Sequence, residues 1–319
     1  MTKGVLMESE IRQQPQILAS NSESYFDQLR SILEGKSFDM VLLAARGSSD
    51  HAAQYARYLI EVKLGIPVSL CAPSVWTRYK STIRYQNCLA VGVSQSGSAP
   101  DVAEVLTAMR TQGHTTLAIT NTADSRITHA AEHTLLLNAG PENSVAATKT
   151  YTSSVLAMYQ LVRAMGADLQ VPDLPTEAWV EEAHDIAARF SGPLNRCAPV
   201  FSIGRGYSFA TAQETALKLM ECALLPCKAY SSADFEHGPK ALAGHGSAAI
   251  SFFGSLAGIQ SQGCEILEVH APLSPEVDME TVFPMWDIVV SQWLALLVAR
   301  SRGLDPDHAR HLNKVTQTL

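Results

Sequence analysis

The sequence has no block of lysine and arginine residues and no long run of apolar residues. Its 24 Lys and Arg are outnumbered by 31 Asp and Glu, which gives a formal net charge of −7 and an isoelectric point near 5.8. Nucleic acids and anionic membrane surfaces attract basic patches, so this balance argues against both as partners. The most apolar stretch, residues 288–299, is shorter than the roughly 18 residues that a membrane span requires. We expect it to form a buried helix.

Targeting and disulfide signals are also scarce. Residues 1–16 contain no apolar core of the signal-peptide type. The six cysteines include no CxxC pair, and a chain of 319 residues can bury a large core without disulfide bonds. We therefore expect a cytoplasmic protein with buried, reduced thiols. With 46% hydrophobic and 17% charged residues, the composition is that of a globular protein, for which small-molecule chemistry is the default function.

Short apolar runs alternate with longer helical patterns, which is typical of βαβ units and a parallel sheet. The predicted strands of the first half are residues 39–45, 66–71, 88–94, 115–120 and 133–137. A helical pattern follows over residues 144–165, and a connector with two prolines then suggests a boundary near residue 170. We predict four segments, namely an N-terminal helical segment (1–34), two subdomains (35–170 and 171–305) and a C-terminal tail (306–319).

The second half repeats the first with an offset of 159 residues. VLLAARGSSDHAAQ at 41–54 matches VFSIGRGYSFATAQ at 200–213 in Val, Arg, Gly, Ser, Ala and Gln. The shared strand–RG–helix context favours a duplicated α/β unit. The copies differ where VSQSGSAP at 93–100 faces FFGSLAGI at 252–259, which has lost the cluster of hydroxyls. A binding loop that is used only once would differ in this way.

The loop after the third predicted strand combines three hydroxyl side chains with a glycine. Ser94, Ser96 and Ser98 surround Gly97, and Pro100 suits the first turn of a helix. Parallel α/β sheets bind ligands at the carboxyl ends of their strands, where the first N–H groups of a helix favour an anion. The loop therefore predicts a phosphate site. The alternative is a serine-rich turn that binds no ligand.

Other phosphate motifs fit less well. There is no GxxxxGK[ST] motif, and GRGYSF at 204–209 has only two of the three glycines of a dinucleotide fingerprint, so nucleotide binding is disfavoured. At the end of the first predicted strand, Gly47, Ser48 and Ser49 could supply further donors to an anion. The alternative role for Ser48 is to cap the following helix, and both roles could coexist.

Charged residues in apolar surroundings mark the helix that follows the second RG turn. Lys218 and Glu221 are three residues apart and therefore share a helix face. His237 lies in the next loop, within FEHGP. A carboxylate and an imidazole on neighbouring elements suit proton transfer at carbon and oxygen, provided that burial shifts their pKa values toward neutrality. The alternative for Lys218 and Glu221 is a simple surface ion pair.

A pair of histidines is a candidate metal site. His129 and His133 have i, i+4 spacing, but we expect one at a helix end and the other in a strand, with no third ligand, so we predict no metal site.

The C-terminal sequence lacks the low complexity of a disordered end and is either a frayed tail or a lid. Its polar residues include Arg310, His311, Asn313 and Lys314.

Six ordered motifs resemble the sugar isomerase (SIS) domain superfamily, in particular the isomerase half of glucosamine-6-phosphate synthase and the glucosamine-6-phosphate deaminases. They are ARGSSDHAA, SQSG, AGPENSVAATK, ALKLMECA, EHGP and DPDHARHLNKV, and the resemblance runs from about residue 8 to the end. It implies an α/β fold with two tandem SIS subdomains, each a parallel β-sheet flanked by helices. It also implies a homodimer with sites near the subunit interface, and neither a metal nor an organic cofactor.

The resemblance implies a set of substrate-binding residues in the first half. Those at the phosphate or the sugar hydroxyls would be Gly47, Ser48, Ser49, Ser94, Gln95 and Ser96. One departure occurs in the loop, because the synthase has a threonine where this sequence has Ala99. Phosphate contact by Ser98, in place of that threonine, is a hypothesis.

The same resemblance implies the chemical roles of residues further along the chain. Val145 would contact the sugar through its backbone, and Glu221 would carry the proton between C2 and C1. His237 would open the pyranose ring, reaching in from a partner subunit. Lys314 would close over the site on the C-terminal tail, and Lys218 would steady Glu221 or an oxyanion.

The chain begins at MTKGVLM without a glutaminase domain, so we expect the ammonia-releasing reaction. We predict a glucosamine-6-phosphate deaminase, which converts glucosamine 6-phosphate and water into fructose 6-phosphate and ammonia. The alternatives are another phosphosugar aldose–ketose isomerase, a fructosamine-phosphate deglycase, and a non-catalytic sugar-phosphate sensor. The first 35 residues are too few and too acidic for the DNA-binding helix-turn-helix that such sensors normally carry.

Overall fold

The computed structural model describes residues 2–272 and 279–314. By its internal contacts the chain divides into two compact units, each built around one parallel sheet. The five-stranded unit consists of Gln16–Pro141 and Thr150–Leu169, and the four-stranded unit of Met1–Pro15, Glu142–Lys149 and Gln170–Lys314. The four predicted segments are each continuous in the chain, and their limits remain a prediction.

The sheet of the five-stranded unit has the order β2-β1-β3-β4-β5, with every pair parallel. Parallel strands are buried on both faces and therefore appear in a sequence as short continuous apolar runs. This property explains why all five predicted strands of the first half are confirmed. Their bounds are β1 (Met40–Ala44), β2 (Val68–Leu70), β3 (Cys88–Val93), β4 (Thr115–Thr120) and β5 (His133–Leu136).

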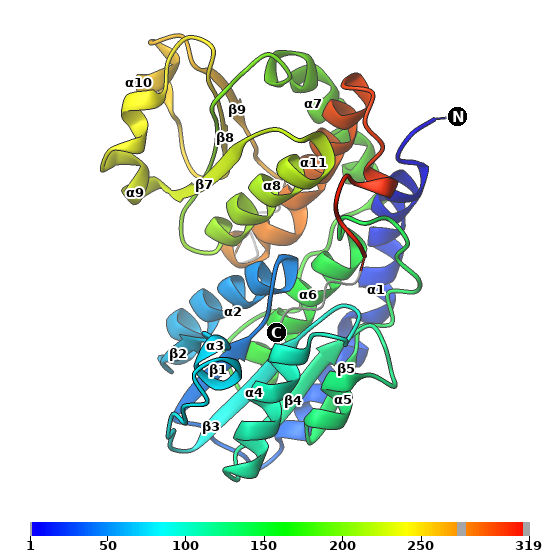
Figure 1. Ribbon diagram of the computed structural model, residues 1–319, viewed down its shortest axis with the longest axis vertical. Coiled ribbons are helices and arrows are strands. Elements are labelled where there is room, and N and C mark those ends of the chain that lie inside the picture. Colours follow the sequence, from blue (N-terminus) through cyan, green and yellow to red (C-terminus); the bar gives the residue numbers. More distant parts are fainter. Residues whose placement is uncertain (1, 273–278, 315–319) are drawn as a thin grey trace. The chain divides into compact units, whose positions relative to one another are not determined.

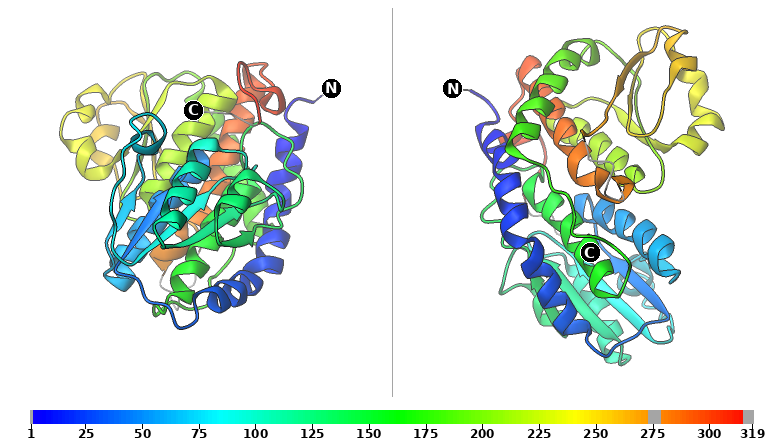
Figure 2. Two further views of the ribbon diagram at one scale, coloured as in Figure 1. Left: turned by 60° about the horizontal axis from the view of Figure 1, so that its bottom comes forward. Right: turned by 180° about the vertical axis from the view of Figure 1, so that it is seen from behind.

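Helices cover both faces of this sheet. On one face, Val102 and Leu106 of α4 pack against Leu42 and Ala90 of the strands, and α5 adds Ile127. Behind the sheet run α6 and the part of α1 that belongs to this unit (Figures 1 and 2). The helix bounds are α1 (Val5–Leu33), α2 (Ser48–Leu64), α3 (Ser74–Thr77), α4 (Pro100–Thr111), α5 (Arg126–Ala130) and α6 (Lys149–Ala164).

The start of α6 differs from the predicted helix, which began at residue 144. Residues 144–148 are not helical, because side chains bind their backbone: Glu10 accepts from the N–H of Ser144, and Glu142 accepts from the N–H of Thr148. Apolar spacing cannot reveal such side-chain acceptors, one of which, Glu10, is 134 residues from Ser144 in the sequence.

The sheet of the four-stranded unit has the order β7-β6-β8-β9 and is also parallel. This order matches β2-β1-β3-β4 strand for strand. The match confirms the predicted duplication and the predicted α/β fold with two parallel sheets. The bounds are β6 (Val200–Gly204), β7 (Cys227–Ser231), β8 (Ala248–Ser251) and β9 (Glu265–Glu268).

Two groups of helices cover the second sheet (Figure 1). The short helices α9 and α10 place Phe235 and Ile259 against Phe201 and Ile203, which point to one face of β6. The longer α8 packs on β6 and contacts α11, which also packs on α7. The bounds are α7 (Glu177–Leu194), α8 (Ser208–Ala223), α9 (Ser232–Glu236), α10 (Ala257–Gln260) and α11 (Met279–Ser301), with 3-10 turns η1 (Pro239–Leu242) and η2 (Pro306–His308).

Helix α11 is the core helix of the four-stranded unit. From Glu280 to Ser301 its length and composition would suffice to cross a membrane, so the prediction that the apolar run is too short is wrong. Burial decides its role instead: 89% of its most apolar window lies inside the protein, which confirms the predicted buried helix. Trp179 of α7 packs against Trp286, and its indole N–H donates to the carbonyl of Trp286.

All six cysteines are free thiols, and five of them are buried as predicted. Cys71 is half-buried, so the prediction fails there. Burial raises the pKa of Cys88 and of Cys222 to about 12, which keeps both as neutral thiols at physiological pH.

A buried carboxyl group in α11 gives a prediction on stability. Asp287 is 2% exposed, and burial raises its pKa well above the ordinary value of 3.8, although a backbone hydrogen bond from Ala271 opposes the shift. The folded chain therefore binds this proton more tightly than the unfolded chain, and the free energy of unfolding falls as pH rises above 3.8. We expect Asp287→Asn to raise the free energy of unfolding by roughly 1–3 kcal/mol at pH 8, and by less toward pH 5.

Denaturant unfolding at several pH values measures this difference. The matched control is Asp168→Asn, which changes an exposed aspartate. A gain in stability that did not depend on pH, or a loss, would contradict the explanation.

Candidate functional site

The hydroxyl loop, residues 94–99, joins β3 to α4 in the five-stranded unit. Its backbone is tied to the neighbouring β4–α5 connection: the N–H of Asn121 donates to the carbonyl of Gln95, and the N–H of Ile127 donates to that of Gly97. Ser94 is 8% exposed, and its hydroxyl has no hydrogen-bond partner among the described residues. The loop thus has a fixed backbone, and the hydroxyl of Ser94 is available to bind a ligand.

Gly97 is required by the shape of this loop. Its φ is +66°, and a Cβ atom there would lie 2.1 Å from Oγ of Ser125, the N-cap residue of α5. No side chain fits without moving the backbone. The absence of a side chain at Gly97 therefore allows the loop to lie close to α5.

The N-cap residue of α4 supplies no side-chain cap, although Oδ1 of Asp101 accepts from the N–H of Val102 in the first turn. Ala99 occupies the N-cap position, with φ −63° and ψ 108°, and makes no capping hydrogen bond. The hydroxyl of Ser98 donates to the carbonyl of Ser96 at 3.3 Å, so it is engaged within the loop. The N–H groups at this 12-residue helix start therefore lack the oxygen that a threonine at position 99 could have provided.

The turn after β1 lies at the same edge of the sheet, because β1 and β3 are adjacent parallel strands. An ion pair joins the two turns: Nε of Arg46 lies 2.8 Å from Oδ2 of Asp101, whose side chain is 3% exposed. Gly47 is the N-cap of α2, with φ +55°, and Ser48 is the first helical residue. Ser48 is therefore not the cap of the helix, which was the alternative role considered for it. Ser49 follows it on the first turn of α2.

In the four-stranded unit, α8 carries a cluster of three charged residues. The ammonium of Lys218 lies 2.6 Å from Oε2 of Glu221 and 3.3 Å from Oε1 of Glu214. The side chains of Lys218 and Glu214 are 1% and 0% exposed, whereas that of Glu221 is 23% exposed. The alternative of a simple surface ion pair is therefore wrong. Glu221 is the member of the cluster that a ligand can reach.

The charge of the buried lysine depends on its two carboxylates. Burial alone would lower the pKa of Lys218, but Glu214 and Glu221 outweigh it and raise this pKa above its ordinary value. Lys218 therefore stays an ammonium, and it holds the carboxylate of Glu221 in one position. Sequence reasoning missed Glu214, although its i, i+4 spacing from Lys218 was a usable signal.

His237 follows α9 in the same unit and is exposed. Its side chain has no hydrogen-bond or ion-pair partner among the described residues. The burial that the sequence analysis required of both His237 and Glu221 is thus absent for the histidine and incomplete for the glutamate.

Two carboxylates fix the segment that contains Val145. Glu10 of α1 accepts from the N–H of Asn143 and from both the N–H and the hydroxyl of Ser144. Glu142 accepts from the N–H and the hydroxyl of Thr148. Burial raises the pKa of Glu10, although the hydrogen bond from Ser144 opposes this change. The backbone around the half-buried Val145 is therefore held from both ends.

Glu142 also binds the C-terminal tail. Its Oε2 lies 2.7 Å from Nζ of Lys314, and its side chain is fully buried. Upstream, Asp307 accepts from the N–H groups of Leu6 and Met7, which fastens the tail to the start of α1. The tail is thus anchored as far as Lys314, and the frayed alternative is wrong for its described part. Neither Glu10 nor Glu142 was singled out from the sequence.

The two histidines with i, i+4 spacing lie apart, as predicted. His129 is in α5 and pairs with Asp124, whereas His133 begins β5 and lies near Glu132. Within residues 2–272 and 279–314, no three His, Cys, Asp or Glu side chains are grouped as metal ligands.

Residues 38–164 match the model of the SIS domain family. This part of the chain is an SIS domain. It contains both turns at the edge of the five-stranded sheet, and the predicted resemblance is confirmed.

Relatives of the SIS domain extend the match over most of the chain. Glutamine–fructose-6-phosphate aminotransferase (isomerizing) of Methanothermobacter thermautotrophicus is 31% identical over 338 residues, which cover 97% of this chain and 56% of the relative. The chain thus spans little more than half the length of the curated relatives it matches.

Solved structures also resemble this chain over most of its length. A candidate phosphosugar isomerase of Silicibacter pomeroyi has a TM-score of 0.77 and 28% identity, with 94% of this chain and 99% of the other covered. Glucosamine-6-phosphate deaminase of Thermotoga maritima has a TM-score of 0.75 and 23% identity, with 95% and 100% covered. The second likeness establishes the fold alone.

The contact between Glu142 and Lys314 gives a prediction on the tail. Glu142→Gln keeps the shape of the side chain but removes the charge that holds Lys314. Hydrogen bonds to charged groups contribute about 1.5–3 kcal/mol, so we expect the free energy of unfolding to fall by about that amount. We also expect faster tryptic cleavage after Arg310, measured by mass spectrometry. Glu182→Gln, at an exposed position, is the control; cleavage at the same rate in both variants would contradict the role of Glu142.

Proposed function

We propose that this chain is a glucosamine-6-phosphate deaminase, which converts glucosamine 6-phosphate and water into fructose 6-phosphate and ammonia. The observation that carries the proposal is the ion cluster on α8. A buried ammonium there holds a partly exposed carboxylate, Glu221, as a proton shuttle requires. The name of a relative supports the substrate class, because the Methanothermobacter thermautotrophicus protein is a fructose-6-phosphate aminotransferase.

The five-stranded unit would contribute phosphate binding. The uncommitted hydroxyl of Ser94, the hydroxyl of Ser96 and the uncapped start of α4 offer donors to a phosphate. Gln95 belongs to the same loop, and Gly47, Ser48 and Ser49 form the adjacent turn, where we propose contacts to the sugar hydroxyls. Ser98 would contribute less than these serines, because its hydroxyl already donates to the loop backbone.

The four-stranded unit would contribute the proton transfers. After the ring opens, Glu221 removes the proton from C2 of the 2-amino aldehyde and returns it to C1, while an N–H proton passes to O1. The product is a C2 imine, which water converts to the ketone with release of ammonia. Lys218 acts by positioning Glu221. The backbone at Val145 and the ammonium of Lys314, both held by Glu142, would bind the sugar.

We propose that the protein acts as a cytoplasmic homodimer and that His237 opens the sugar ring in the partner's site. The support is its exposure, together with the absence of a partner for its imidazole among the described residues. A general acid–base group that serves another chain has to be accessible in its own chain.

A second candidate function is the aldose–ketose isomerisation of a neutral hexose phosphate. The likeness to the Silicibacter pomeroyi protein favours it, because that match covers nearly the whole of both chains. The same carboxylate would move the same proton, and no ammonia would be released. Turnover of glucose 6-phosphate faster than of glucosamine 6-phosphate would favour this function.

Ammonia release from glucosamine 6-phosphate, measured with a coupled assay, tests the proposed reaction. We expect Glu221→Gln to lower kcat by roughly 10²–10⁴-fold, because the amide cannot carry the proton. KM should change little. An equally active Glu221→Gln variant, or a wild-type chain that releases no ammonia, would refute the proposal.

Two controls accompany this assay. Glu182→Gln should keep full activity, because this glutamate is exposed on α7. Mixing inactive Glu221→Gln chains with inactive His237→Ala chains should restore part of the activity if His237 serves the partner subunit. No recovery in mixed dimers would contradict that role.

The hydroxyl loop gives a prediction on KM. Ser96→Ala removes one donor to the phosphate, and a hydrogen bond to a charged group is worth about 10- to 100-fold in binding. We therefore expect KM for the phosphorylated substrate to rise by about that factor, with melting temperature unchanged. Ser81→Ala, at an exposed serine of the same unit, is the control. An unchanged KM would remove the phosphate assignment.

A further inference from the structure

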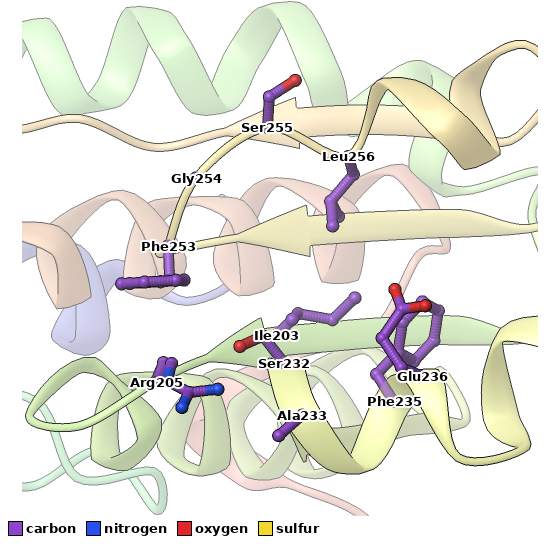
Figure 3. A pocket seen from close by; sticks show the side chains of 10 residues that line it. All are labelled: Ile203, Arg205, Ser232, Ala233, Phe235, Glu236, Phe253, Gly254, Ser255 and Leu256. Carbon is purple, nitrogen blue, oxygen red and sulfur yellow. The ribbon is translucent and has the colours of Figure 1, made fainter.

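The four-stranded unit has its own pocket at the carboxyl ends of its strands. This pocket has a volume of about 320 Å³, and its lining residues come from the ends of β6 and β8 and from α9 (Figure 3). They include Arg205, Ser232, Phe235, Glu236 and Phe253. The carboxyl edge of a parallel sheet is where α/β folds bind ligands, and the volume is at the lower end of the range for small-molecule sites.

Arg205 is the unusual residue of this pocket. It stands at the 159-residue offset from Arg46, which pairs with Asp101 in the other unit. The turn over residues 252–260 contains no acidic residue, and position 260, which corresponds to Asp101, is Gln. Among the described residues the guanidinium of Arg205 has neither a hydrogen-bond partner nor an ion-pair partner. The second copy has thus kept the arginine and lost the carboxylate that neutralises it.

The rest of the pocket suits a ligand with a ring and hydroxyl groups. In Figure 3, Ser232 lies on the same side as Arg205, whereas Glu236 lies toward the other end. Glu236 also pairs with Lys240 at 2.8 Å, and its carboxylate oxygens can accept hydrogen bonds from a ligand. Phe253 is 46% exposed, although it is a large aromatic residue, and it presents a face for the C–H groups of a sugar.

The floor of the pocket is rigid. Phe235 is 1% exposed and packs edge-on against Phe201, with 5.2 Å between ring centroids, and Tyr230 packs on both rings. Ile203 of β6 completes this apolar base. A fixed apolar floor between a cation and a carboxylate can orient a ring whose two ends differ in charge.

We propose that this pocket is a second binding site of the chain, for a sugar phosphate. Arg205 binds the phosphate with Ser232, Glu236 accepts hydrogen bonds from sugar hydroxyls, and Phe253 covers one face of the ring. The site lies wholly within the four-stranded unit and shares no residue with the hydroxyl loop or the Lys218 cluster. It would therefore sense a phosphosugar independently of the reaction proposed above.

Calorimetric titration of the full chain with fructose 6-phosphate tests the proposal. We expect two binding events per chain, and Arg205→Gln should weaken one of them at least tenfold while leaving the other unchanged. Arg189→Gln, at an exposed arginine of α7, is the matched control and should retain both events. Hydrogen exchange should show protection of residues 230–236 and 252–256 by the ligand in the control and not in Arg205→Gln.

Phe253→Ala and two simpler ligands test the ring contacts. Phe253→Ala should weaken the second event for fructose 6-phosphate but not for inorganic phosphate. Inorganic phosphate or fructose alone should bind there at least tenfold more weakly than fructose 6-phosphate. Titration of Arg205→Gln that equals that of the wild-type chain, or equal affinity for inorganic phosphate, would overturn the proposal, whatever the number of events in the wild-type chain. Ammonia release is not measured, so these outcomes are separate from those of the deaminase assay.

Discussion

A buried ammonium on α8 sets the constraint on which the four-stranded unit depends. Lys218 can stay charged inside the protein only while Glu214 and Glu221 lie beside it, and loss of one partner from a buried pair costs about 3–5 kcal/mol. The three residues occupy one helix face, so the cluster fixes how α8 is rotated about its axis. Thr215 supports this orientation, because its hydroxyl lies 2.7 Å from that of Ser291 on α11. The position of Glu221 therefore follows from folding and needs no bound substrate.

Much of this architecture could be predicted from local sequence, and the reason is physical. Strands buried on both faces form short apolar runs, so β1 to β5 were found with bounds close to those observed. The 159-residue offset also identified equivalent strands before any pairing was known. Neither result required knowledge of contacts between distant residues.

What the sequence could not reveal depends on such distant contacts. The start of α6 is delayed by an acceptor on Glu10, 134 residues before Ser144, and the tail is held by Glu142, 172 residues before Lys314. The length of the apolar run was a poor guide to the role of α11, because the helix is long enough to cross a membrane and its burial decides the role instead. The exposure of His237 follows from where α9 ends, which its motif does not specify.

The order of the segments along the chain has a consequence for biosynthesis. The chain passes between the two units after Pro15, Pro141, Lys149 and Leu169. The ribosome thus finishes Gln16–Pro141 and Thr150–Leu169 early, while two pieces of the other unit wait for Gln170–Lys314. At about 5–20 residues per second, that wait lasts roughly 7 to 30 s. During this time residues 2–15 and 142–149 can bind each other, through Glu10 and Ser144, but the sheet that completes their unit has not yet been made.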